Sequence, residues 1–133
     1  MRFVMAYVGV LVVFGAVDAA WLTFMGPIIY RPVLADILAT NLRIAPAIAF
    51  YLIYPIGVVV FAVAPALRSG SLGGAFALAM AFGAIAYGTY DLTNYATLRV
   101  WSLQITVLDM VYGALASGIA AAAAFLLIRL AGR

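Results

Sequence analysis

The chain has 133 residues, of which 69% are hydrophobic and only 8% are charged, whereas water-soluble domains are about half apolar and about one quarter charged. This composition indicates an integral membrane protein. The seven positive side chains are all arginine, the four negative ones are all aspartate, and histidine and cysteine are absent. We therefore expect no cofactor, no structural zinc site and no nucleic-acid surface, while a cation held by carboxylates stays an alternative.

Four apolar runs are long enough to cross a bilayer as helices, which takes about 20 residues. In chain order they cover residues 3–25, 44–67, 72–98 and 105–130. Their composition lacks the two-residue alternation of a membrane barrel strand, and only helices or closed barrels satisfy every backbone group in lipid. The sequence therefore predicts an all-α fold: a single domain over residues 1–133, built as a polytopic four-transmembrane-helix bundle.

The connection between the first and second runs is longer than the others. Gly26-Pro27 is expected to end the first helix, and Pro32 suits the start of a short one. One face of this segment, opposite Asp36, carries Val33, Leu34, Ile37 and Leu38. The pattern predicts a short interfacial helix between the first and second spans, with an ordinary surface linker as the alternative.

Pro55 lies in the middle of the second run, with Tyr51 and Tyr54 before it and Gly57 after it. Because proline cannot donate a hydrogen bond to the carbonyl of Tyr51, we expect a kink there. A carbonyl freed in this way could help to bind a cation or a substrate near polar groups. More often a neighbouring helix satisfies it, and the proline then means only a bend.

Short turns at residues 68–71 and 99–104 make the last three helices antiparallel neighbours. One membrane face then carries Arg2, Arg68, Arg129 and Arg133, and the other carries Arg31, Arg43 and Arg99, offset by Asp36. The positive-inside rule accordingly assigns both termini to the cytoplasm, by a margin of one arginine.

Three aspartates lie inside the apolar runs at similar depth, in the half of the bundle away from the termini: Asp18, Asp91 and Asp109. An aspartate at mid-helix costs about 2.5 to 3.5 kcal/mol on insertion scales, so each needs compensation from its surroundings. Polar and aromatic side chains share a helix face with each of them, at i, i+3 and i+4 spacing. Turned inward, these faces would meet in a polar pocket. The candidate binding residues are Asp18, Trp21, Tyr87, Asp91, Asn94, Tyr95, Asp109 and Tyr112.

The pocket hypothesis has a purely structural counterpart. Polar side chains often serve as interhelical hydrogen-bond contacts, worth about 0.6 kcal/mol each, and we favour that role for the threonines and tyrosines. Ionisable groups inside membranes are functional candidates by default, and three ionised carboxylates would repel one another, so we expect at least one to be protonated at neutral pH. Arg99 is expected to be a snorkelling anchor, and is also a candidate for holding a phosphate or carboxylate at the pocket mouth.

Three stretches carry a family likeness: Asp18-xx-Trp21, the block 87–98 followed by Trp101, and Leu108-Asp109-xx-Tyr112-Gly113. Together they resemble a family of small bacterial four-helix inner-membrane proteins that is catalogued only as a domain of unknown function. The likeness spans essentially the full chain. It implies a four-helix fold in a bacterial inner membrane, and it implies no activity.

Three functions fit these observations. The first is binding or transport of a small cationic or hydroxylated ligand, or of a lipid headgroup. The second is a non-catalytic accessory or scaffold subunit of a larger membrane complex. The third and weakest is a lipid-modifying enzyme with carboxylates as acid and base, for which no catalytic residue can be assigned. The expected partners are membrane lipids, a small-molecule ligand, and either further copies of the chain or a larger complex.

Overall fold

Four long helices make up the computed structural model, which describes residues 1–132. Arg133, counted above among the arginines of one face, lies outside the described residues. The helices cover Arg2–Leu34, Ile44–Ser69, Leu72–Thr97 and Leu103–Ala131, and each is long and apolar enough to cross a membrane. Residues 1–132 contain no strand. The predicted all-α fold with four membrane-spanning helices is confirmed.

The sequence predicts that the first helix ends at Gly26-Pro27, and this prediction is wrong. The helix runs through α1 (Arg2–Met25), the π-helical segment η1 (Gly26–Tyr30) and α2 (Arg31–Leu34) without leaving helical geometry. The separate interfacial helix is not confirmed, because Pro32 to Leu34 belong to the last turn of this long helix and residues 35–43 form turns and extended chain. Gly26 itself has right-handed helical angles, with φ −52° and ψ −56°.

Both π-helical segments in the structure directly precede an X-Pro pair. η1 is followed by Arg31-Pro32, and η2 (Val59–Val63) is followed by Ala64-Pro65. A proline has no N–H, and its ring collides with the carbonyl four residues earlier. A wider turn, closed by the Ala64 N–H donating to the Val59 carbonyl in the second span, makes room for the ring. The second span, α3 (Ile44–Val58), η2 and α4 (Ala64–Ser69), therefore has its irregular segment just beyond the kink predicted at Pro55.

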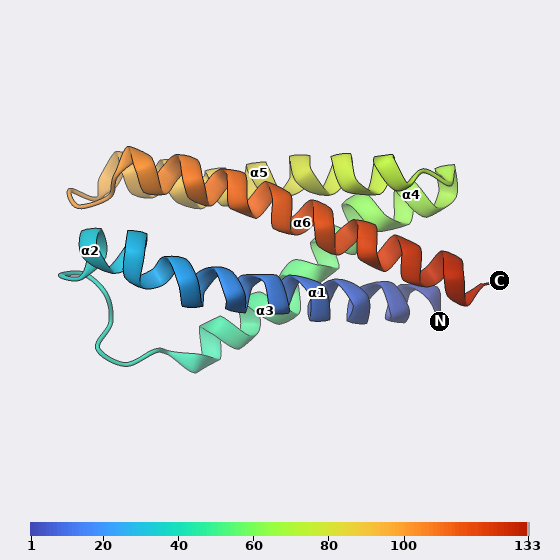
Figure 1. The fold of residues 1–133 in the computed structure, drawn as a ribbon, viewed down its shortest axis with the longest axis horizontal. Coiled ribbons are helices and arrows are strands. Elements are labelled where there is room, and N and C mark those ends of the chain that lie inside the picture. Colours follow the sequence, from blue (N-terminus) through green and yellow to red (C-terminus); the bar gives the residue numbers. More distant parts are fainter. Residues whose placement is uncertain (133) are drawn as a thin grey trace.

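Short capped turns join the last three spans. Gly70 ends α4 with a left-handed φ of 70°, and the Ser71 hydroxyl accepts a hydrogen bond from the Gly74 N–H at 2.9 Å at the start of α5 (Leu72–Thr97). The Ser102 hydroxyl likewise accepts from the Ile105 N–H at the start of α6 (Leu103–Ala131). These turns place α5 beside α4 and beside α6 (Figure 1).

The last helix is the centre of the bundle. In its most apolar 18-residue window, 61% of α6 is buried, against 22% to 33% for the corresponding windows of the other spans. It packs against both α1 and α5, while the second span crosses α1 obliquely, with α3 against α1 and α4 beside α5 (Figure 1). Glycine lets the backbones of α5 and α6 approach each other closely, because a Cβ on Gly83 would lie 2.5 Å from the Gly113 carbonyl oxygen.

A buried aspartate and tyrosine network as the candidate functional site

The three intramembrane aspartates are all buried. Asp18 from α1, Asp91 from α5 and Asp109 from α6 expose 6%, 0% and 7% of their surface. Burial of this degree removes each carboxyl group from water and from lipid headgroups alike, so its hydrogen bonds must come from the neighbouring helices. The contacts of each aspartate differ.

Asp18 ties three spans together. The Tyr51 hydroxyl, from α3, donates to Asp18 Oδ2, and the Tyr112 hydroxyl, from α6, donates to Asp18 Oδ1 at 2.5 Å. Both carboxyl oxygens therefore have a strong donor. Hydrogen bonds from two other spans therefore hold α1, α3 and α6 together at this side chain.

Asp109 is part of a second set of contacts that reaches back to the first. The Tyr30 hydroxyl donates to Asp109 Oδ1, and the same hydroxyl accepts from the Trp21 indole N–H at 2.8 Å. The Trp21 ring stacks on Tyr112, with centroids 4.3 Å apart and an interplanar angle of 6°. A continuous set of hydrogen bonds and ring contacts thus connects Asp109 with Asp18. We call these residues, together with Asp91, the Asp–Tyr network.

Asp91 is the unsatisfied member of the Asp–Tyr network. Neither of its oxygens has a hydrogen-bond partner among the described residues, although the side chain is fully buried. Asp91 and Asp109 are carried by the neighbouring helices α5 and α6, which pack against each other. The arginines of this half of the molecule, Arg31, Arg43 and Arg99, are all exposed. No group of three or more histidine, cysteine, aspartate or glutamate side chains in residues 1–132 has an arrangement that could hold a metal ion.

The other predicted site residues differ in how far they are buried. Tyr87 is half-buried and makes edge-to-face ring contacts with Tyr54 and Tyr112, at 6.1 Å and 5.9 Å between centroids. Asn94 is half-buried, whereas Tyr95 is 45% exposed and Arg99 is exposed. The structure thus brings Tyr87 to the Asp–Tyr network and leaves Tyr95 and Arg99 on the surface, where a binding role for them stays a prediction.

Two donors of the Asp–Tyr network, Tyr30 and Tyr51, were not among the predicted site residues. The sequence points to Tyr51 only through the proline kink, and Tyr30 lies beyond the expected end of the first helix. Nine residues make about two and a half turns of α-helix, which would set Tyr30 opposite Trp21. The extra residue accommodated in η1 turns Tyr30 back towards Trp21, so that the two side chains, nine residues apart, form a hydrogen bond. Each buried carboxyl group needs a hydrogen-bond donor, and this need is the signal in the sequence that could have pointed to the two tyrosines.

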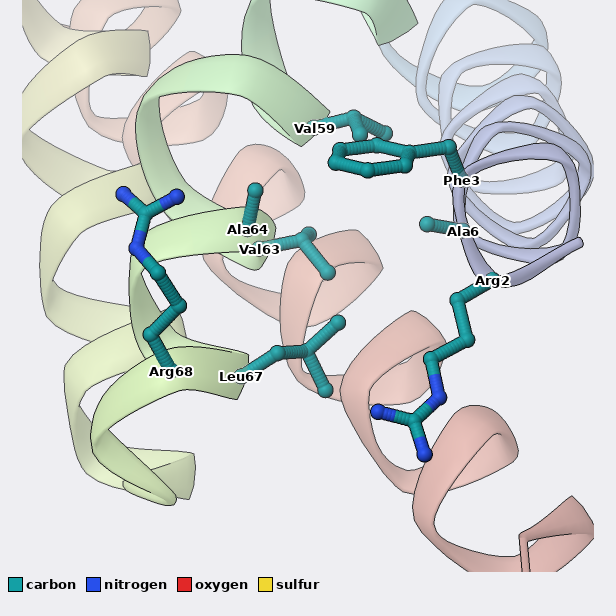
Figure 2. Close-up of a pocket in the computed structure, with 8 residues that line it drawn as sticks. All are labelled: Arg2, Phe3, Ala6, Val59, Val63, Ala64, Leu67 and Arg68. Atoms are coloured by element: carbon teal, nitrogen blue, oxygen red, sulfur yellow. The ribbon is translucent and has the colours of Figure 1, made fainter.

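Two cavities in the structure lie at the opposite end of the bundle. The larger, of about 360 Å³, is lined by residues of α1, η2 and α4 and has Arg2 and Arg68 at its edge (Figure 2). The smaller, of about 260 Å³, shares Arg2 and Leu67 with it and is also lined by Arg129. Near the aspartates, the rings of Trp21 and Tyr87 both pack against Tyr112.

Comparison with known proteins identifies the family of the chain. The family described as "Predicted membrane protein (DUF2177)" matches residues 3–126, nearly the whole chain. No curated protein and no solved structure matches the chain. The match agrees with the likeness read from the aspartate motifs, and its description states a membrane protein without an activity.

Proposed function

The chain belongs to the DUF2177 family of predicted membrane proteins, and we propose that it binds a positively charged species, a proton or a small cation, at the buried carboxyl groups of Asp91 and Asp109. The observation that carries this proposal is the complete burial of Asp91 with both oxygens unpartnered, on a helix that packs against the one carrying Asp109. Binding at this position corresponds to the first of the three functions considered above.

Charge balance is the physical argument. Two ionised carboxylates side by side in a poorly solvated site repel one another, and a buried pair is compensated either by a proton held between them or by a cation. The chain has no lysine or histidine, and the arginines of this half are exposed. The described side chains therefore supply no compensating positive charge, and a mobile positive species is the remaining source.

The hydrogen bonds of the Asp–Tyr network suggest how binding would be transmitted. Asp109 contacts the first span through Tyr30, and Asp18 contacts the second span through Tyr51. A change of charge at Asp91 and Asp109 alters the hydrogen bond that Asp109 accepts from Tyr30. Through Trp21 and Tyr112 the change is passed on to Asp18, whose hydrogen bond from Tyr51 fixes the position of α3. The π-helical segment η2 lies within that span. On this basis we include transport in the proposal, and we expect the second span to bend at η2.

The proposal is tested by thermal unfolding of the purified protein in detergent, with sodium, potassium, magnesium, calcium and ethanolammonium chlorides added separately at pH 5 to 8. We expect at least one cation, or protons alone, to raise the unfolding midpoint, because a ligand that binds only the folded state stabilises it by about 2.7 kcal/mol at 100 times its dissociation constant. Asp91→Asn removes one carboxylate charge and should abolish the effect.

The matched control is Asp36→Asn, which makes the same change of charge at an exposed position in the connection between the first two spans. It should keep the response of the unmodified chain. If neither pH nor any of the five cations changes the midpoint, or if Asp36→Asn and Asp91→Asn behave alike, the proposed site is wrong.

A specific observation also favours the accessory or scaffold function. Both oxygens of Asp18 are satisfied by tyrosine hydroxyls from two other spans, which is the arrangement expected of a structural contact. On that alternative, Asp91→Asn would lower the midpoint modestly without any dependence on added cations, and the protein would co-purify with a larger membrane complex after mild solubilisation. The same unfolding experiment therefore separates the two functions.

A further inference from the structure

The arginine-rich end of the bundle contains a second candidate site, remote from the Asp–Tyr network. The cavity of about 360 Å³ lies between the start of α1 and the end of the second span, and its volume falls in the range of about 300 to 1,000 Å³ usual for ligand pockets. It exists because the second span crosses α1 obliquely, so that α4 leaves α1 and packs beside α5 instead (Figure 1).

The lining of this cavity is amphipathic. Six of its eight lining residues are apolar, Phe3, Val63 and Leu67 among them, and the other two are Arg2 and Arg68. Figure 2 shows the arginines on opposite sides of Leu67, Arg2 extending from the start of α1 and Arg68 from α4. A soluble anion would use only the arginines, whereas a molecule with an acidic head and an apolar tail would use the whole lining.

The charge at this end has no carboxylate side chain to balance it. Asp18, Asp91 and Asp109 are in the Asp–Tyr network and Asp36 is in the connection between the first two spans. Arg2 and Asp18 are separated by about 24 Å along α1, at about 1.5 Å per residue. The adjoining cavity of about 260 Å³ adds Arg129 to Arg2, and the Arg129 guanidinium lies 5.9 Å from the centre of the Phe125 ring. Three arginines thus border two adjacent cavities in helices that span a membrane.

We propose that this end of the bundle is a binding site for an anionic phospholipid, with the phosphate at Arg2 and Arg68 and one acyl chain in the apolar cavity between α1 and α4. Arginine suits the phosphate because its planar guanidinium donates two parallel hydrogen bonds to phosphate oxygens. Basic pockets between transmembrane helices are known to take acidic headgroups. Phosphatidylglycerol has the required chemistry: one net negative charge and two acyl chains.

The experiment measures unfolding midpoints of the full chain in detergent micelles that contain dioleoyl phosphatidylglycerol, and in micelles that contain dioleoyl phosphatidylcholine at the same molar ratio. We expect phosphatidylglycerol to raise the midpoint above that in phosphatidylcholine. In the double variant Arg2→Gln/Arg68→Gln, the apparent affinity for phosphatidylglycerol should fall at least tenfold. Inorganic phosphate and glycerol 3-phosphate should not reproduce the stabilisation, because neither fills the apolar cavity.

The matched control is Arg31→Gln/Arg43→Gln, which removes the same charge at exposed positions at the other end of the bundle. It should retain the full response, and both double variants should unfold normally in phosphatidylcholine. The proposal is overturned if the two lipids stabilise the protein equally, or if both double variants lose the response to the same extent. If the soluble phosphates stabilise the protein as well as the lipid does, the site is a simple anion site and the lipid assignment is wrong.

Discussion

At the scale of single residues, the cost of burying three carboxyl groups explains the positions of the tyrosines. A buried aspartate is tolerated only where donors or a positive charge compensate it. Asp18 has two tyrosine donors, Asp109 has one, and Asp91 has none among the described residues. The number of donors therefore distinguishes Asp18, which has a structural role, from Asp91 and Asp109, where we propose that a positive species binds.

The prediction at this scale concerns Tyr112. Tyr112→Phe keeps the ring that stacks on Trp21 but leaves Asp18 Oδ1 without its donor, so we expect a loss of about 1 to 2 kcal/mol in the free energy of unfolding. Tyr95→Phe is the same substitution at a side chain that is 45% exposed, and its effect should stay within about 0.5 kcal/mol. Unfolding in mixed detergent micelles measures both, and equal losses would show that the hydrogen bond to Asp18 does not stabilise the bundle.

At the scale of helices, the prolines are accommodated without ending the spans. In lipid an interrupted helix would expose unpaired backbone groups at a cost of several kcal/mol each. Pro27 and Pro32 therefore stay inside the first span and Pro55 and Pro65 inside the second, with a π-helical segment ahead of Pro32 and another ahead of Pro65. The expectation that Gly26-Pro27 ends the first helix is wrong, because the wider turn of η1 carries the helix on to Leu34.

Glycine at the contact between α5 and α6 provides the prediction at this scale. In Gly83→Ala the new Cβ would lie 2.5 Å from the Gly113 carbonyl oxygen and 2.6 Å from Ser117 Oγ. The helices must separate to admit it, and we expect a loss of about 1 to 3 kcal/mol in the free energy of unfolding. Gly73→Ala, in the same helix, meets no atom closer than 4.0 Å and should be neutral or slightly stabilising because alanine favours helix. A similar cost for both would show that the close contact at Gly83 is not the cause of the loss.

At the scale of the whole molecule, the two ends of the bundle differ in charge and in chemistry. Arg2, Arg68 and Arg129 border the two cavities at one end. The Asp–Tyr network lies in the other half, which also contains Arg31 in α2 and the connection with Asp36 and Arg43. Figure 1 shows the start of α1 and the end of α6 at the same end of the bundle. We propose that this end faces the cytoplasm of a bacterial inner membrane, in keeping with the positive-inside rule.

The absence of cysteine from the sequence makes this orientation directly testable. Single cysteines introduced by Ser69→Cys and Thr40→Cys occupy exposed positions at opposite ends of the bundle. With a membrane-impermeant maleimide applied to intact spheroplasts, we expect Thr40→Cys to react and Ser69→Cys to react only after lysis. The reverse pattern would invert the orientation and would place the proposed lipid site in the outer leaflet.

The sequence by itself determined the membrane class, the four helices and the three buried aspartates, because hydropathy and run length are local properties and an ionisable residue in an apolar run has few alternatives to an inward position. Only the tertiary structure decided which donors each aspartate has, since Tyr30 and Tyr51 reach Asp109 and Asp18 from other spans. It alone placed Tyr95 and Arg99 on the surface and revealed the cavity beside Arg2 and Arg68. Hydrogen-bond partners and cavities depend on the rotation and crossing of the helices, and these follow from π-helical segments and close glycine contacts that no single run of residues encodes.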